Sequence, residues 1–371
     1  MFGFAGLLGL LLAGTAIDFS GGDSAPDDHD DTGDGGSDDS GSGAEGMDTD
    51  DGPGSILDFL GVGGSAGDGA ETGSTAGPGP DAPQPGEGAD LTGGAGNDTI
   101  EGTDGDDTIA AGGGDDVAYG GVGADDISGG AGNDLVLGAG GNDTLSGDEG
   151  NDRLEGDAGA DSLHGGDGDD ALMGQAGADR LAGGGGDDTL IGGPGNDRMS
   201  GGDGNDGLMG CVGNDVLEGG NGADVLNGNR GDDVILGVNA DRDAGALVDD
   251  GSQDYLNGGE GQDILLIGGE DNVTGGDGAD TFTLGDWIEE GGPAVIEDYN
   301  PDEDALVVLY DDTAHPDPQL SIDAPEDGSG DAVLALDGMP LAHVAGGAGL
   351  DASQVSLVPQ SSMATALAQA A

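Results

Sequence analysis

The chain has 371 residues, of which 78 are acidic and only five basic, so its formal net charge is −73. This charge excludes nucleic acid as a natural partner, because phosphate binding needs the opposite sign, and it disfavours anionic membrane surfaces for the same reason. Glycine accounts for 88 residues and aromatic side chains for 3 %, a composition typical of disorder, so we expect the chain by itself to be largely unfolded.

Residues 1–17, with the sequence MFGFAGLLGLLLAGTAI, form a continuous apolar run. A secretory signal peptide begins with a basic region, and this run contains no lysine or arginine. As a membrane span, a run of this length is at the lower limit. The run is compatible with an anchor, with a signal peptide, or with a segment packed on the rest of the chain.

Residues 18–91 are low-complexity sequence rich in Gly, Asp, Ser, Ala and Pro, such as GGSDDSGSG and GPGPDAPQPGEG. This composition predicts a disordered, solvated linker. One apolar islet, residues 56–60, interrupts it.

Residues 63–67, GGSAG, have the spacing of a hydrolase nucleophile elbow. That motif needs a strand before it and a helix after it, and neither is predicted, so we interpret the match as accidental.

From Gly93 to Leu236 a nine-residue unit recurs sixteen times without a gap. Its pattern is Gly-Gly-x-Gly-(Asn/Asp)-Asp-x-apolar-x, and we number its positions 1 to 9. Position 4 is Gly and position 6 is Asp in all sixteen copies. The glycines predict a tight turn, and the three residues after the aspartate predict a short strand with one buried side chain. Cys211, the single cysteine, replaces a turn glycine and permits no internal disulfide.

Two turns and two strands make one coil of eighteen residues, so residues 92–236 are expected to be an all-β, two-sided parallel solenoid. Eight coils at roughly 4.8 Å each give a rod about 38 Å long. One apolar residue per unit is a thin core that does not offset the backbone entropy of so many glycines. Stacking also places the position-6 aspartates in columns, where unpaired like charges repel each other.

A bound cation would resolve both problems. Turns rich in backbone carbonyls and closed by carboxylates suit a hard ion such as calcium, whereas zinc, copper and iron prefer the sulfur and imidazole ligands that are scarce here. The candidate metal ligands are the position-6 aspartates of the sixteen units and of two later copies: Asp98, Asp107, Asp116, Asp125, Asp134, Asp143, Asp152, Asp161, Asp170, Asp179, Asp188, Asp197, Asp206, Asp215, Asp224, Asp233, Asp263 and Asp280.

The repeated unit resembles the calcium-binding nonapeptide repeat of the RTX (repeats-in-toxin), hemolysin-type proteins. The resemblance implies a parallel β-roll in which several Ca²⁺ ions are held between successive turns by the position-6 aspartates and by loop carbonyls. It also implies that a type I secretion apparatus exports the chain, so that the protein is extracellular and either secreted or associated with the cell surface.

Residues 237–283 are expected to be an interrupted, degenerate continuation of the solenoid. Residues 237–248, GVNADRDAGALV, are an insertion whose Asn239, Asp241 and Asp243 have the spacing of an EF-hand loop. Ala244 replaces the glycine that such a loop requires, so a solvated loop is predicted.

Degenerate units resume after the insertion, with Asp254, Asp263 and Asp280 at position 6. The segment IGGEDNVT between the last two is about one residue short, and no clear position-6 aspartate is identified in it. We therefore expect no ligand from this segment.

Residues 284–371 differ from the repeats in composition, with alternating apolar residues and the aromatic side chains of Trp287, Tyr299 and Tyr310. Residues 332–344 predict a hairpin with its turn at Asp337-Gly338, and residues 355–358 predict a further strand. We expect residues 284–358 to form a β cap on the open end of the solenoid. The Ala-rich tail is compatible with the C-terminal export signal that the resemblance implies.

No catalytic constellation is recognised in the sequence. No HExxH motif occurs, and the four histidines show no metal-ligand spacing: His29, His164, His315 and His343. We expect a non-enzymatic, calcium-loaded structural or interaction protein of the cell exterior. The alternatives are a surface adhesin and a non-catalytic remnant of an RTX exoenzyme.

The two faces of the solenoid should differ in chemistry. Odd-numbered units form one face, with outward apolar side chains at Val117, Tyr119, Leu135, Leu137, Met173, Ile191, Met209 and Val225. The other face is mainly polar along its middle. Exposed apolar ladders usually mark contact surfaces, so the odd face is expected either to be covered by the chain's own apolar segments or to mediate self-association or binding to a cell-surface partner.

Overall fold

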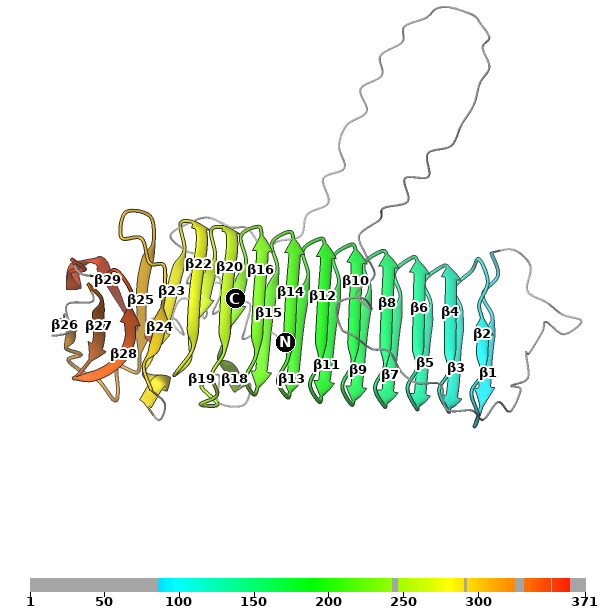
Figure 1. Cartoon of the computed structure of the whole chain (residues 1–371). Helices are drawn as coiled ribbons and strands as arrows, with labels where there is room; N and C mark the ends of the chain where they lie inside the picture. Colours follow the sequence, from blue (N-terminus) through cyan, green and yellow to red (C-terminus); the bar gives the residue numbers. More distant parts are fainter. Residues whose placement is uncertain (1–85, 242–245, 290–291, 324–329, 348, 361–371) are drawn as a thin grey trace, which may run out of the picture.

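The computed structural model describes residues 86–360, except 242–245, 290–291, 324–329 and 348. These residues form an elongated rod in which two long sheets lie back to back (Figure 1). The only helices in this part of the chain are two short 3₁₀ turns, η1 (Asp286–Glu289) and η2 (Ala352–Gln354). The predicted all-β parallel solenoid is therefore confirmed.

The two sheets contain thirteen and fourteen strands. Sheet A consists, in spatial order, of β1 (Asp90–Gly94), β3 (Thr108–Gly113), β5 (Asp126–Ala131), β7 (Thr144–Glu149), β9 (Ser162–Asp167), β11 (Arg180–Gly185), β13 (Arg198–Asp203), β15 (Val216–Asn221), β17 (Val234–Leu236), β21 (Ile264–Leu266), β23 (Thr281–Gly285), β25 (Ala305–Tyr310) and β29 (Val355–Pro359). Sheet B consists of β2 (Thr99–Glu101), β4 (Val117–Val122), β6 (Leu135–Gly140), β8 (Arg153–Ala158), β10 (Ala171–Ala176), β12 (Thr189–Pro194), β14 (Gly207–Val212), β16 (Val225–Arg230), β20 (Tyr255–Gly261), β22 (Asn272–Gly278), β24 (Ala294–Ile296), β28 (Met339–Val344), β27 (Ala332–Leu336) and β26 (Leu320–Asp323).

Strands of the regular array pair in parallel with the strand one coil later, as Ile109 pairs with Ile127 eighteen residues on. Most of these strands have six residues rather than the predicted three, because each runs from position 7 of one unit to position 3 of the next. Two positions per strand therefore face inward, position 8 and position 1, and the second is glycine in nearly every unit. In β3 they are Ile109 at position 8 and Ala111 at position 1, which are 1 % and 0 % exposed.

The position-8 side chains form one continuous apolar core along the rod. The column begins at Ile100 and Ile109 and continues into Phe282 and Leu306 near the far end. Every position-8 residue of the sixteen units is buried, so the predicted one-residue-per-unit core is present, and it is as thin as the sequence indicates.

The solenoid extends beyond the sixteen regular units at both ends. Its first strand, β1, begins at Asp90, inside the segment that the sequence assigns to the linker. At the other end β25 and β29 continue sheet A in parallel, and β24 and β28 continue sheet B in parallel. The cap strands therefore continue both sheets, and only β27 and β26, at the outer edge of sheet B, are antiparallel.

The expected hairpin of the cap is present as β27 and β28. Asp337 and Gly338 at its turn have φ angles of 52° and 87°. Two successive positive φ angles are characteristic of the tight turns that join twisted antiparallel strands.

The insertion folds back onto the solenoid, so the prediction of a solvated loop is wrong for most of it. Its strands β18 (Asn239–Asp241) and β19 (Ala246–Val248) form an antiparallel hairpin at the side of the rod (Figure 1). Outward-facing side chains of sheet A are buried at this point, because Leu247 of the hairpin and Trp287 pack against them: Val234, Leu236, Ile264 and Leu266. The EF-hand-like spacing includes Asp243 and Ala244, which lie outside the described residues.

The predictions for residues 1–17, for the linker up to residue 85 and for the tail from residue 361 also concern parts of the chain that lie outside the described residues. Within the described part, none of the helices has the length and apolar character needed to cross a membrane.

Candidate metal centre

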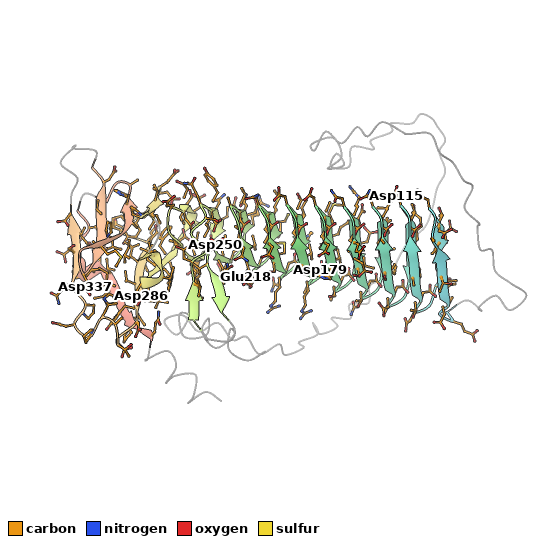
Figure 2. The ribbon with its side chains drawn as sticks, turned by 90° about the horizontal axis from the view of Figure 1, so that it is seen from below. Asp115, Asp179, Glu218, Asp250, Asp286 and Asp337 are labelled. Carbon is orange, nitrogen blue, oxygen red and sulfur yellow. The ribbon has the colours of Figure 1, made fainter. Side chains whose placement is uncertain are left out.

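The position-6 aspartates line the two edges of the rod, where the chain turns from one sheet to the other. One column comes from the turns that lead into sheet B, from Asp98 to Asp224, and the other from the turns that lead into sheet A, from Asp107 to Asp280. All of the predicted ligands except Asp98 are at most 3 % exposed. The structure therefore brings the predicted residues together as two buried columns of carboxylates, and Figure 2 shows Asp179 on one of the middle coils.

Within a column, each carboxylate is oriented by the coil that precedes it. The backbone N–H of Asp107 donates to Oδ1 of Asp125 at 2.8 Å, and the N–H of Asp125 donates to Oδ1 of Asp143 at 2.9 Å. The same bond recurs along both columns at intervals of eighteen residues. One oxygen of each aspartate is thus used to join successive coils.

The other oxygen has no hydrogen-bond partner among the described residues. The atoms concerned are Oδ2 of Asp116, Asp125, Asp134, Asp143, Asp152, Asp161, Asp170, Asp179, Asp188, Asp197, Asp206, Asp215, Asp224, Asp233 and Asp263, and each is buried. A buried charged oxygen without a partner costs several kcal/mol. A whole column of them indicates that each oxygen has a ligand to bind.

These oxygens face the position-1 glycines. A Cβ atom on Gly120 would lie 2.3 Å from Oδ2 of Asp125 and 2.9 Å from the carbonyl oxygen of Gly138, one coil later. At Gly201 the corresponding distances, to Asp206 Oδ2 and to the carbonyl of Gly219, are 2.2 and 2.5 Å. These turns therefore present a carboxylate oxygen and a carbonyl oxygen of the next coil to one small space, which only glycine leaves open.

Position 5 adds a second ladder that the sequence analysis did not identify. The N–H of Asn151 donates to Oδ1 of Asn133 at 2.8 Å, and the N–H of Asn205 donates to Oδ1 of Asp187 at 2.8 Å. These side chains point toward the following coil, whereas position-6 carboxylates point toward the preceding one. The preference for Asn or Asp at position 5 is the signal that could have revealed it.

Burial raises the pKa of the position-6 carboxylates from Asp116 onward above the ordinary value of 3.8. The pKa of Asp161 rises to about 6 and that of Asp197 to about 7, because burial disfavours the charged form more than the N–H bond to Oδ1 favours it. Neighbouring aspartates of the same column add a smaller upward contribution. Without a cation, the folded array holds these groups in an unfavourable environment.

The donor set fits calcium. It consists of carboxylate and carbonyl oxygens, which are the ligands of a hard divalent cation. Within the described ranges, no three side chains of Asp, Glu, His or Cys are close enough to hold a metal ion by themselves. An ion at these turns therefore needs main-chain oxygens as well, and carbonyls such as those of Gly138 and Gly219 supply them.

Two position-6 aspartates are absent from the predicted ligand set. Asp254 is 2 % exposed and Asp271 is fully buried, and the N–H of Asp254 donates to Oδ1 of Asp271 at 3.0 Å. Pairing of Tyr255 with Asn272 shows that Asp271 occupies position 6 in its coil. The expectation that this segment supplies no ligand-like aspartate is therefore wrong, because a seventeen-residue coil shifts the spacing by one residue.

Fold and site together define an elongated, parallel β-solenoid with oxygen-lined cation sites repeated along its turns. Comparison with known proteins agrees with this class. The family model of the RTX calcium-binding nonapeptide repeat matches residues 86–118, 112–145, 119–154, 146–181, 173–208, 212–239 and 247–266. Residues 86–266 thus carry several copies of the RTX calcium-binding repeat, and this repeat array is a structural, calcium-binding element.

Two further comparisons add little to this assignment. No curated protein matches the chain. Among solved structures the chain is similar to the extracellular lipase LipA from Serratia marcescens, with 19 % identity and a TM-score of 0.21, over 63 % of this chain and 40 % of the lipase chain. The chain therefore spans less than half of the length of that lipase.

Proposed function

We propose that the chain is a secreted or cell-surface structural protein whose solenoid folds when it binds extracellular calcium. The observation that supports this is the double column of buried, unpartnered Oδ2 atoms beside a core of one apolar residue per unit. Such an array is poorly stable without metal, so ion-binding free energy becomes folding free energy. Calcium supplies positive charge to carboxylates that would otherwise repel each other.

The residues proposed to hold the ions are the eighteen predicted position-6 aspartates, together with Asp254 and Asp271. Fifteen of them contribute an unpartnered Oδ2, while Oδ1 stays bonded to the neighbouring coil, and position-1 carbonyls such as that of Gly138 contribute further oxygens. Magnesium should substitute poorly, because its small octahedral shell does not suit flexible cages of main-chain oxygens.

Circular dichroism of the full chain during a calcium titration tests this proposal. We expect coil in chelator and β structure at millimolar Ca²⁺.

Replacing Asp197 with Asn should raise the calcium concentration at the midpoint of folding, because the amide keeps the acceptor for the N–H of Asp179 but loses the charged oxygen. Asp187→Asn is the matched control, since exposed Asp187 at position 5 needs only an acceptor for Asn205. A chain that is β-rich in chelator would refute calcium-driven folding.

Export is proposed to use a type I secretion apparatus that recognises the C-terminal region. Low cytosolic calcium would keep the solenoid unfolded and able to pass through a channel, and the millimolar exterior would then fold it. Deletion of residues 320–371 should retain the protein inside a producing cell, whereas deletion of residues 1–17 should not. Retention by the N-terminal deletion alone would point to a signal-peptide route.

A further inference from the structure

The insertion brings a carboxylate to a place where the regular units have none. Asp249 follows β19 and stands five residues before Asp254, so it occupies position 1 of its unit, which is glycine in nearly all regular copies. Its Oδ2 accepts a hydrogen bond from the N–H of Gly269 at 2.6 Å and its Oδ1 accepts one from Gly251 at 2.9 Å. These bonds hold the end of the insertion against the turn of the next coil.

Oxygen atoms of several segments meet at this turn. A Cβ atom on Gly268 would lie 2.8 Å from the carbonyl oxygen of Gly237, 3.0 Å from Asp249 Oδ1 and 3.1 Å from Asp271 Oδ2. A Cβ atom on Gly237 would lie 2.7 Å from Asp271 Oδ2 and 3.2 Å from Asp254 Oδ2. Asp271 Oδ2, which also accepts the N–H of Gly268 at 2.6 Å, borders both spaces and connects them. The Cδ1 methyl group of Leu256 lies beside the second space, 3.1 Å from the Gly237 Cβ position.

The burial of Asp254 provides independent evidence for a ligand here. Its side chain is 2 % exposed, and its Oδ1 accepts the N–H of Asp224 at 2.9 Å. Its Oδ2 accepts no hydrogen bond from any described residue and faces Gly237, beside the equally buried Asp271. Two buried carboxylates at one turn repel each other unless a cation lies between them.

We propose that the interruption of the solenoid holds a separate calcium site, formed by Asp249, Asp254, Asp271 and the carbonyl oxygen of Gly237. A regular turn such as that of Gly201 offers one carboxylate oxygen and one carbonyl, whereas this turn offers three carboxylates. The affinity of oxygen sites rises with the number of charged ligands, so this site fills before those of the regular array. The inference rests on the proposed calcium-dependent folding and adds a distinct site to it.

Main-chain oxygen is required here as well, because the three carboxylates are not close enough to hold an ion by side chains alone. The site would join Gly237, directly after the last regular unit, to the end of the insertion and to the next two coils. It would therefore hold together the two parts of the solenoid on either side of the interruption.

The chain contains a natural reporter for this site. Trp287 is the only tryptophan in the sequence. Its indole Nε1–H donates to the carbonyl oxygen of Ile267 at 2.9 Å, directly before Gly268, and its ring packs against the apolar cluster under the insertion. Tb³⁺, a luminescent substitute for Ca²⁺, should be sensitised by Trp287 when it binds here.

The experiment is a stoichiometric Tb³⁺ titration of the metal-free full chain, excited at the red edge of tryptophan absorption so that tyrosines do not contribute. We expect tryptophan-sensitised emission to saturate within the first one or two equivalents, before most of the β structure forms. In Asp249→Asn the emission should instead rise throughout the titration. Asp179→Asn, the same change at a regular turn, should keep the early saturation.

Emission that rises in proportion to all added ions in the wild type, or early saturation in Asp249→Asn, would overturn the proposal. If Asp249→Asn does not fold at saturating calcium, Asp254→Asn replaces it, because its Oδ1 still accepts the N–H of Asp224. If only this separate site is absent, the circular dichroism of the chain still depends on calcium. If the proposed calcium-dependent folding is wrong, the circular dichroism does not depend on calcium at all.

Discussion

At the scale of single residues, the structure explains why position 4 tolerates only glycine. Gly159 has a φ angle of 150°, and a Cβ atom there would lie 1.4 Å from the carbonyl oxygen of Gly141, one coil earlier. The same contact recurs along the rod at Gly177 and Gly213. Position 2 is more permissive, since Cys211 is accommodated there with a φ angle of 83°. Close approach of successive backbones, rather than turn formation alone, therefore explains the invariance of position 4.

Replacing Gly159 with Ala should destabilise the calcium-bound solenoid by about 2–4 kcal/mol, because the new methyl group would push two coils apart and the backbone angle is strained for alanine. Gly185→Ala is the matched control, since no atom lies within 4 Å of its Cβ position. Denaturant unfolding at fixed calcium concentration measures both. Equal midpoints for the two variants would show that the coils can separate without cost.

At the scale of the elements, the turn columns make the metal-free solenoid sensitive to pH. Burial raises the pKa of Asp161 to about 6 and that of Asp197 to about 7, from an ordinary value of 3.8. The folded array therefore binds protons more tightly than the unfolded chain does. Proton binding to these carboxylates therefore stabilises the folded array. The stabilisation is fully present below about pH 4 and is lost as the pH rises through 6 and 7. Calcium and protons compete for the same carboxylates, so calcium should bind more weakly in that acidic range.

We therefore expect the metal-free chain to gain β structure when it is acidified from about pH 8 to about pH 5. Circular dichroism of metal-stripped protein in chelator-free buffer measures this, since chelators lose affinity in acid. Because the sequence pI is about 4.1, samples should be centrifuged first to exclude aggregates. Coil at every pH would show that protonation alone does not relieve the repulsion within the columns.

At the scale of the whole molecule, the two sheets present different surfaces. The outward apolar cluster of sheet A is buried under the β18–β19 hairpin. On sheet B, outward apolar side chains remain accessible: Tyr119, Met209, Val225 and Tyr255 are 40 %, 42 %, 55 % and 53 % exposed. Pairing places Ile191 between Met173 and Met209, so these three side chains form a continuous apolar ladder. Glu155 and Asn227 occupy the next positions on either side of it. The nearby charges of Arg153 and Glu155 neutralise each other in an ion pair of 2.6 Å. In a strongly acidic chain, this nearly neutral face is the surface on which a second copy meets the least repulsion.

Replacing Leu137 and Ile191 with Asp should leave calcium-dependent folding intact and abolish self-association through sheet B. The matched control replaces Ala110 and Ala182 with Asp, which adds the same charge on the outer face of sheet A. Sedimentation equilibrium in calcium compares the three proteins. A wild type that stays monomeric at all concentrations would contradict self-association through this face.

The amino-acid sequence by itself determined the solenoid, the thin core and the oxygen chemistry of the turns, because a fixed nine-residue period repeats every local choice along the rod. It did not determine which residues meet where the period fails. Asp271 reaches position 6, and Asp249 reaches the turn of Gly268, only because sheet pairing re-establishes the register after a thirty-residue and a seventeen-residue coil. Likewise, the hairpin covers sheet A because Val234 and Leu236 leave an apolar surface to bury. Pairing and burial between distant segments are cooperative properties of the folded chain, and tertiary structure alone decided them.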